Sequence, residues 1–337
     1  MDTLNISLIG LGYWGINYLR VLLLLNNIKL KYICDKNQKK AEKYSNVAKI
    51  VKDPSILAKD KELDAVIIAT PASTHYEIAK LMLQAGKHVL IEKPFTMKYS
   101  EAEELSQLSR QMNTILMVGH IYCFNPAVNY IREILNTGKL GNLLYGVGLR
   151  LGLGPIRNDA SCTWDLATHD IAILDYLLAK EPVAVSAHAG SFFQKAKGIY
   201  DYANILLYYD QGFTFNLIVS WYAAEKIRTW YLMGSNCMLK FDDMNKTAPL
   251  MIFDKKVDLV INEGEGDVTP VPREGGVAIP YIKQEEPLLL EVKHFLECIR
   301  DGKKPLTDCE QGLRVVKILE LIEESIKRHG QLLEVRS

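Results

Sequence analysis

The sequence predicts an α/β protein with a doubly wound parallel sheet in its N-terminal part and a large, open, mostly antiparallel sheet in an α+β C-terminal part. In roughly the first 120 residues, short apolar runs alternate with helical stretches, as in strands buried between two helical layers. Further on, the runs lengthen, alternate with polar residues and become rich in aromatic side chains, which favours antiparallel strands. We expect a dinucleotide-binding domain over residues 1–121 and a second domain over 122–337, close to the prior of about two domains for this length.

Each strand expected in the first domain is an apolar run bounded by a turn or a polar residue. These runs lie at residues 6–9, 30–34, 65–69, 88–91 and 115–118. Helical stretches follow at 13–25, 41–44, 76–85 and 101–112. This strand–helix alternation predicts parallel pairing, because a parallel neighbour requires a crossover connection.

In the second domain, helices are expected at residues 126–136 and 165–178, and two more close the chain at 287–300 and 309–328. The expected strands lie at 143–149, 183–189, 203–209, 213–221, 229–233 and 238–241. Repeated Gly, Pro and acidic residues predict a loop over residues 262–284.

The composition excludes several classes of protein. Forty Lys and Arg residues balance forty Asp and Glu residues, so a general electrostatic affinity for nucleic acid or for a membrane surface is not expected. No apolar run approaches the roughly 20 residues that span a bilayer, and the N-terminus lacks the pattern of a signal peptide. Six scattered cysteines without a C-x-x-C pair predict reduced thiols in a cytoplasmic protein and no metal site.

A glycine-rich segment lies between the first apolar run and the first helix, in the context that dinucleotide binding requires. It comprises Gly10, Leu11, Gly12, Tyr13, Trp14 and Gly15. Its glycines allow a tight turn, close approach of a pyrophosphate and close helix packing, and the helix N-terminus faces the phosphates. Asp35 ends the second strand twenty residues after Gly15, where a carboxylate would hold the ribose hydroxyls. Because that carboxylate would repel a 2′-phosphate, NAD is favoured over NADP.

Two further loops follow strands at the same edge of the sheet, where ligands of such folds lie. The first carries Thr70, Pro71, Ser73 and His75. It either forms a wall of the cofactor site or starts a helix, with Ser73 or Thr74 as N-cap and His75 as a structural residue. The second is Glu92-Lys93-Pro94. A lysine beside a nicotinamide could shuttle a proton or stabilise an alkoxide, although the bare tripeptide is also compatible with a charged surface turn.

A tryptophan-led segment supplies the remaining chemistry. Trp164 precedes Asp165, and His169 follows four residues later, so the carboxylate and the imidazole share one face of a helix. Such a pair is a common acid–base arrangement. Metal binding and a helix with a purely structural histidine are the alternatives, and no third clustered ligand supports the metal.

Together these segments resemble the Gfo/Idh/MocA family of NAD(P)-dependent sugar oxidoreductases. The resemblance runs from the glycine segment through residues 92–94, 119–126 and 164–170 to the closing segment at 286–305. It implies a Rossmann domain, a second domain with a large open sheet, a substrate bound at the nicotinamide, and a homodimer or homotetramer formed through one sheet face.

By the same resemblance Lys93, Asp165 and His169 match the catalytic positions. His169 is expected to take the hydroxyl proton, Asp165 to orient the imidazole and Lys93 to hold the developing alkoxide, although Lys93 could also take the proton. Glu92, Lys93, Pro94 and Trp164 join the glycine segment, Asp35 and the Thr70–His75 loop as cofactor contacts. The expected substrate contacts are Lys93, Tyr122, Arg150, Arg157, Asp165, His169 and Arg228, with Lys226 as a further basic candidate.

The tryptophan before the Asp–His pair is closest to the branch of the family that acts on nucleotide-linked sugars. That branch implies oxidation of the C3 hydroxyl of a UDP-linked amino sugar, UDP-N-acetylglucosamine or its uronate, to a ketone for later amination. Two alternatives stay open: an inositol or free-monosaccharide dehydrogenase, and an NAD-binding regulator without catalysis.

Overall fold

The structure, a computed structural model, describes residues 3–261 and 268–336. The chain divides into two compact units. The first runs to Asn125 and also includes Glu285–Glu320, and the second comprises Pro126–Gln284 and the chain from Leu321 onward. Within the described ranges, none of the helices combines the length and the apolar character needed to cross a membrane.

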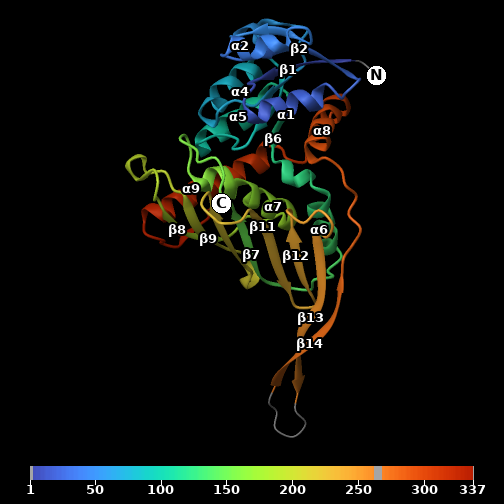
Figure 1. Ribbon diagram of the computed structural model, residues 1–337, viewed down its shortest axis with the longest axis vertical. Helices are drawn as coiled ribbons and strands as arrows, with labels where there is room; N and C mark the ends of the chain where they lie inside the picture. The colour runs from blue at the N-terminus through green and yellow to red at the C-terminus, as the bar shows by residue number, and fades with distance from the viewer. Residues whose placement is uncertain (1–2, 262–267, 337) are drawn as a thin grey trace. The chain divides into compact units, whose positions relative to one another are not determined.

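A parallel sheet forms the centre of the first unit (Figure 1). Its strands in the described chain are β1 (Leu4–Ile9), β2 (Ile28–Cys34), β3 (Lys49–Val51), β4 (Ala65–Ile68), β5 (His88–Glu92) and β6 (Leu116–Gly119). Their order is β3-β2-β1-β4-β5-β6, and every pairing is parallel. This confirms the doubly wound sheet. The direction of winding reverses between β1 and β4, and ligands of doubly wound sheets bind beyond the carboxyl ends of the strands at such a point.

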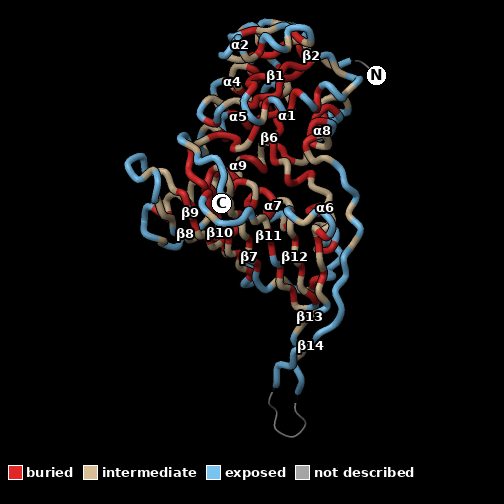
Figure 2. The backbone as a smooth tube through the Cα atoms, in the orientation of Figure 1, coloured by how far each residue is buried: buried red, intermediate tan, exposed pale blue. Residues whose placement is uncertain are grey.

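Helices connect these strands, and the strands are buried beneath them. The helices are α1 (Tyr13–Leu22), α2 (Gln38–Ala41), α3 (Ser55–Lys59), α4 (His75–Gln84) and α5 (Tyr99–Gln111). Right-handed crossovers place α1 on one face of the sheet and α4 and α5 on the other, because the winding reverses. All residues of β4 and β6 are buried, as Figure 2 shows for the centre of this unit. Burial on both faces explains why these strands are continuous apolar runs in the sequence.

The C-terminal part of the chain completes the first unit. Helix α8 (Pro287–Asp301) packs beside α1, and α9 (Cys309–Lys327) begins in this unit. Tyr18 on α1 contacts Glu291 on α8, and Arg300 donates a hydrogen bond to the carbonyl of Asn27 at 2.8 Å. The compact units therefore do not follow the single boundary predicted at residues 121 and 122, because α8 buries its apolar side on the first unit.

The second unit contains a mixed, mostly antiparallel sheet with the helices α6 (Pro126–Asn136) and α7 (Thr168–Leu178). The described strands are β7 (Leu143–Leu151), β8 (Ala184–Gly190), β9 (Tyr202–Tyr208), β10 (Thr214–Ser220), β11 (Ile227–Gly234), β12 (Met238–Asp242), β13 (Leu250–Ile261), β14 (Val268–Ala278) and β15 (Leu333–Glu334). Their order is β14-β13-β12-β11-β7-β10-β9-β8-β15, with β7 and β10 parallel and the other pairs antiparallel. The expected open sheet is confirmed.

One face of this sheet is closely packed around an aromatic pair. The rings of Phe215 and Trp230 lie 4.6 Å apart between centroids. Gly146 and Gly148 on β7 make room for them, since a Cβ atom at these positions would lie 2.5 Å and 2.9 Å from the Phe215 ring. The two glycines of this strand are therefore determined by packing rather than by a turn.

The loop expected over residues 262–284 is wrong for residues 268–278, which form β14 and pair with β13 (Figure 1). Residues 262–267 lie outside the described residues. Pro270 and Pro272 suggested a loop, but β14 is an edge strand of the sheet, and an edge strand tolerates proline because one side needs no donor. Its residues are exposed, so it also lacked the alternation of a half-buried strand.

Candidate functional site

The glycine segment of the first unit fits a dinucleotide. Gly10 has a φ of 95°, and a Cβ atom there would lie 2.6 Å from the carbonyl oxygen of Ala69. At Gly15 the Cβ would lie 2.0 Å from the carbonyl oxygen of Gly10, so both positions require glycine. Gly12 is exposed, with only one atom within 4 Å of an added Cβ, and it precedes α1, whose N-terminus has no side-chain cap. The uncapped N–H groups and the open approach at Gly12 are suited to a pyrophosphate.

Asp35 lies at the end of β2 against the glycine segment. One carboxylate oxygen accepts the N–H of Leu11 at 2.6 Å, and the other accepts the N–H of Asn37 at 2.7 Å. The side chain is half-buried, and each oxygen keeps a lone pair for a ribose hydroxyl. The residues of this unit therefore fit NAD, with the phosphates at α1 and the ribose at Asp35.

Replacing Asp35 with alanine is expected to weaken NADH binding by about 10- to 100-fold, the effect of one or two charge-assisted hydrogen bonds. Binding of NADPH should weaken much less, because the repulsion of its 2′-phosphate disappears with the carboxylate. Fluorescence titration with both cofactors measures the ratio. Asp53→Ala, which removes an exposed carboxylate of the same unit, is the control. An unchanged NADH-to-NADPH ratio in Asp35→Ala would exclude the ribose contact.

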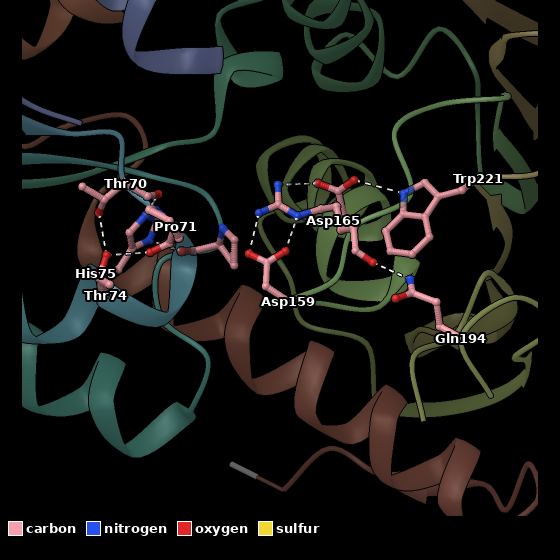
Figure 3. A network of polar contacts seen from close by, with 10 residues as sticks. Thr70, Pro71, Thr74, His75, Asp159, Asp165, Gln194 and Trp221 are labelled. Atoms are coloured by element: carbon pink, nitrogen blue, oxygen red, sulfur yellow. Dashed lines mark hydrogen bonds and ion pairs between the residues drawn. The ribbon is translucent and has the colours of Figure 1, made fainter. Parts of the chain in front are cut away.

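The buried side chain of His75 contacts two loops of the first unit, the one at Thr70 and the one at Pro94 (Figure 3). Its Nδ1 lies 2.8 Å from the carbonyl oxygen of Pro94 and its Nε2 lies 3.0 Å from that of Thr70. It is only 1% exposed, which favours the structural alternative over a direct cofactor contact. Pro71 and Ser73 are exposed, and Thr74 occupies the N-cap position of α4, as one of the alternatives predicted, although its side chain caps no backbone N–H there.

Lys93 follows directly after β5. Its N–H donates to a carboxylate oxygen of Glu92 at 3.0 Å, and its side chain is half-buried. Glu92 points inward, and burial raises the pKa of its carboxyl group to about 7, against the opposing effect of nearby Lys93. Glu92 is thus an internal group and not an open cofactor contact. Tyr122, in the short helical turn Ile121–Phe124 after β6, is buried as well.

Asp165 of the second unit lies in a π-helical turn, Thr163–Ala167, that leads into α7. The expected helix therefore starts earlier, with one wide turn. The carboxylate of Asp165 accepts a hydrogen bond from Nε1 of Trp221 at 3.1 Å, and Nη1 of Arg157 lies 3.6 Å away (Figure 3). An indole donor and a guanidinium therefore both face this carboxyl group.

Other polar groups fix Arg157 in turn. Asp159 accepts from its Nε at 3.0 Å and from its Nη2 at 2.8 Å, and Gln194 donates to its backbone carbonyl at 2.5 Å. Hydrogen bonding to Asp159 raises the pKa of Arg157 further above its usual value. Asp159, Gln194 and Trp221 were not identified from the sequence. They come from separate loops, and no spacing pattern connects them with Asp165.

His169 lies in the first turn of α7 and is half-buried, so the second unit places it one turn from Asp165. The preceding Trp164 is buried, and its backbone carbonyl accepts the Thr168 hydroxyl at 2.5 Å. Thr163 donates to Glu323 on α9 at 2.5 Å, which ties the π-helical turn to a second helix. Within the described residues, no cluster of three or more His, Cys, Asp or Glu side chains is arranged to bind a metal.

Two of the expected substrate contacts have internal partners. Arg150 is 5% exposed, and its Nε and Nη2 lie 2.5 Å and 3.1 Å from the carboxylate of Asp170. That carboxylate also accepts the indole N–H of Trp230 at 2.7 Å. Arg150 thus belongs to a buried ion pair, which does not favour a substrate contact. Arg228 pairs with Asp243 at 3.1 Å, whereas Lys226 is exposed.

Comparisons with known proteins bear on this site. The family described as "Oxidoreductase family, NAD-binding Rossmann fold" matches residues 4–120, and the "GFO/IDH/MocA C-terminal domain" matches residues 128–240. The chain is 28% identical over 318 residues to the UDP-N-acetylglucosamine 3-dehydrogenase of Acidithiobacillus ferrooxidans, which covers 94% of this chain and 95% of that protein. It is 26% identical to the scyllo-inositol 2-dehydrogenase (NAD(+)) of Bacillus subtilis, and this match covers 92% of this chain and 90% of that protein.

A solved structure of UDP-N-acetylglucosamine 3-dehydrogenase from Acidithiobacillus ferrooxidans has the same fold. Its TM-score is 0.82 at 24% identity, and the match covers 98% of this chain and all of that one. The two domains of one family match successive parts of the chain, and two proteins named as dehydrogenases are similar to it over most of its length. The protein accordingly belongs to the Gfo/Idh/MocA family of NAD-dependent sugar dehydrogenases.

Proposed function

We propose that this enzyme oxidises the C3 hydroxyl of a UDP-linked amino sugar, UDP-N-acetylglucosamine or its uronate, to the 3-keto sugar with NAD. The observation that carries the proposal is the carboxylate of Asp165 beside Arg157, at the start of the helix that carries His169. The similarity to a UDP-N-acetylglucosamine 3-dehydrogenase over 94% of the chain supports the choice of sugar.

In the proposed reaction, NAD held by the glycine segment and Asp35 would supply the acceptor for the hydride that leaves the C3 carbon. His169 takes the proton of the C3 hydroxyl, so that the two electrons of the C–H bond leave as hydride and the C–O bond becomes a carbonyl. Asp165 orients the imidazole and stabilises its charged form, as a carboxylate does beside a histidine base. Lys93 stabilises the negative charge that develops on the oxygen.

Arg157 is the basic side chain that we assign to the diphosphate or uronate of the substrate. It is partly exposed, and the planar guanidinium suits bidentate binding of an anion. Lys226 is a second exposed cation on the same unit. The carboxylate of Asp159 currently occupies the Nε and Nη2 donors of Arg157, so an anionic substrate would have to displace it or bind through Nη1.

Nicotinamide absorbance tests the proposal in parallel reactions with UDP-N-acetylglucosamine, its uronate, myo-inositol and glucose. A coupled aminotransferase or an added acceptor draws off the product where the equilibrium is unfavourable. Reduction with a UDP-sugar alone is the expected result. Reduction with a free polyol alone would favour the second candidate, an inositol or monosaccharide dehydrogenase, which the similarity to the scyllo-inositol enzyme motivates. No reduction with any substrate would favour an NAD-binding regulator.

We also propose a homodimer or homotetramer formed through the C-terminal sheet. One face of β7, β9 and β10 is half-exposed and carries apolar side chains, including Val147, Leu149, Leu206 and Ile218. Burial of such a surface would favour association. The cytoplasmic location stays a prediction from the sequence.

A further inference from the structure

Three titratable side chains meet in the interior of the first unit. The hydroxyl of Tyr18 on α1 lies 2.9 Å from Oε1 of Glu92 on β5 and 2.9 Å from Oε2 of Glu291 on α8. All three are fully or almost fully buried. A Cβ atom at Gly119 on β6 would lie 3.1 Å from the Tyr18 hydroxyl, so the cluster fills its space closely.

Counting protons shows that this cluster cannot contain two carboxylates. A phenol has one hydrogen to donate, and an ionised carboxylate can only accept. With both carboxyl groups ionised, one of the two 2.9 Å contacts would set a phenol lone pair against a carboxylate, away from water. Such an uncompensated contact is costly in the interior. At least one carboxyl group therefore carries a proton that it donates to the oxygen of Tyr18.

The surroundings identify Glu291 as that acid. Glu92 accepts the backbone N–H of Lys93 at 3.0 Å and lies beside the Lys93 cation, which favours its ionised form. The Oε1 atom of Glu291 is buried with no hydrogen-bond partner among the described residues. Burial, followed by the charge of Glu92, raises the pKa of Glu291 well above its usual value. Burial also raises the pKa of Tyr18, so the phenol keeps its hydrogen.

We propose that Glu291 is a positioning residue that stays protonated at neutral pH: it donates to Tyr18, Tyr18 donates to Glu92, and this chain of hydrogen bonds fixes the carboxylate that anchors Lys93. The hydrogen bonds then run in one direction from α8 through α1 to β5. The positioning of Lys93 rests on the function proposed above, whereas the protonation of Glu291 does not.

The pH dependence of stability follows from the proton count. Within the described residues, the charged neighbours that influence the cluster are its own members and Lys93. An unfolded glutamate has a pKa of about 4.3, so at pH 7 the folded protein holds a proton that the unfolded chain releases. The contribution of this proton to stability is complete below that value and is lost as the pH rises through the raised pKa of Glu291.

Proton release on unfolding tests the protonated acid directly. The purified full chain is unfolded in urea in weakly buffered solution at pH 7, and an indicator dye reports the protons released. Glu291→Gln is expected to release about one proton fewer than the wild type, since its amide donates to Tyr18 without an ionisable hydrogen. Glu297→Gln changes an exposed residue of the same helix and should release as many protons as the wild type. Equal release from Glu291→Gln and the wild type would overturn the proposal.

Kinetics test the positioning role. Glu291→Met and Tyr18→Phe, which break the chain of donors, are expected to lower kcat by about 10-fold or more while the Kd for NADH changes less than about twofold, because a small displacement of a reacting group is costly. Glu291→Gln should stay within about threefold of the wild type. Wild-type kcat in Glu291→Met, together with loss of turnover in Lys93→Ala, would refute positioning and leave the proposed function intact. Full turnover in Lys93→Ala would instead refute the proposed role of Lys93, and proton release would still decide the state of Glu291.

Discussion

Replacing His169 with asparagine is expected to lower kcat by about 100- to 10,000-fold, the usual effect of losing a general base. Asparagine keeps a similar size and can form a hydrogen bond, but it cannot take a proton at neutral pH. The binding of NADH should be unchanged, because we assign the imidazole to the substrate hydroxyl. Stopped-flow turnover with the best substrate of the panel and NADH titration measure the two quantities.

His188→Asn is the matched control for this variant, since it changes an exposed histidine on β8 and should retain the wild-type kcat. Loss of NADH binding in His169→Asn would contradict its assignment to the substrate. The pH profile of kcat/KM separates the two possible bases. If His169 takes the proton, the acidic limb of the profile disappears in His169→Asn. An acidic limb that persists in His169→Asn and changes in Lys93→Ala would assign the proton to Lys93.

The second large effect is expected at Asp170. Its replacement with alanine should lower the free energy of unfolding by about 3 to 5 kcal/mol, the cost of removing one member of a buried ion pair. Arg150 would lose its carboxylate partner in the interior, and the indole N–H of Trp230 would lose its acceptor. Urea unfolding followed by tryptophan fluorescence measures the change.

Two variants show whether this effect has the cause we assign to it. Asp243→Ala removes the partner of the partly exposed Arg228 and should cost no more than about 1 kcal/mol. The double variant Arg150→Met, Asp170→Leu removes both charges and should recover much of the lost stability. If Asp170→Ala were as stable as Asp243→Ala, the buried Arg150–Asp170 ion pair would not contribute the stability that we assign to it.

Local patterns in the sequence predict much of the cofactor half of the site. The glycine segment and Asp35 could be recognised because a turn, a helix start and a strand end have fixed spacings. Asp165 and His169 were recognised for the same reason, four residues apart. Positions that depend on distant contacts could not be recognised. Tyr18 and Glu291 are separated by 273 residues, and each reads as an ordinary helical position in sequence.

The π-helical turn and the edge strand show a second limit. Nothing in the composition of residues 163–167 distinguishes a wide turn from an α-helical one, and the ties of this turn to Trp221 and Glu323 come from remote segments. The prolines of β14 led to the prediction of a loop. Its pairing with β13 could not be predicted, because an exposed edge strand shows little periodicity. Local propensity is a weak guide wherever tertiary contacts decide the conformation.

The return of α8 to the first unit has a consequence for the order in which the protein is made. A ribosome synthesises the whole of Pro126–Gln284 before it reaches Glu285–Glu320, so the nucleotide-binding unit waits for its last helices until synthesis is almost complete. A nascent chain that ends at Asn125 already contains Tyr18 and Glu92 but lacks the acid that completes their hydrogen bonds. The first unit to emerge can thus close its interior only near the end of synthesis, and the second unit waits for the chain from Leu321 onward, so domain-by-domain folding during translation applies to neither in simple form.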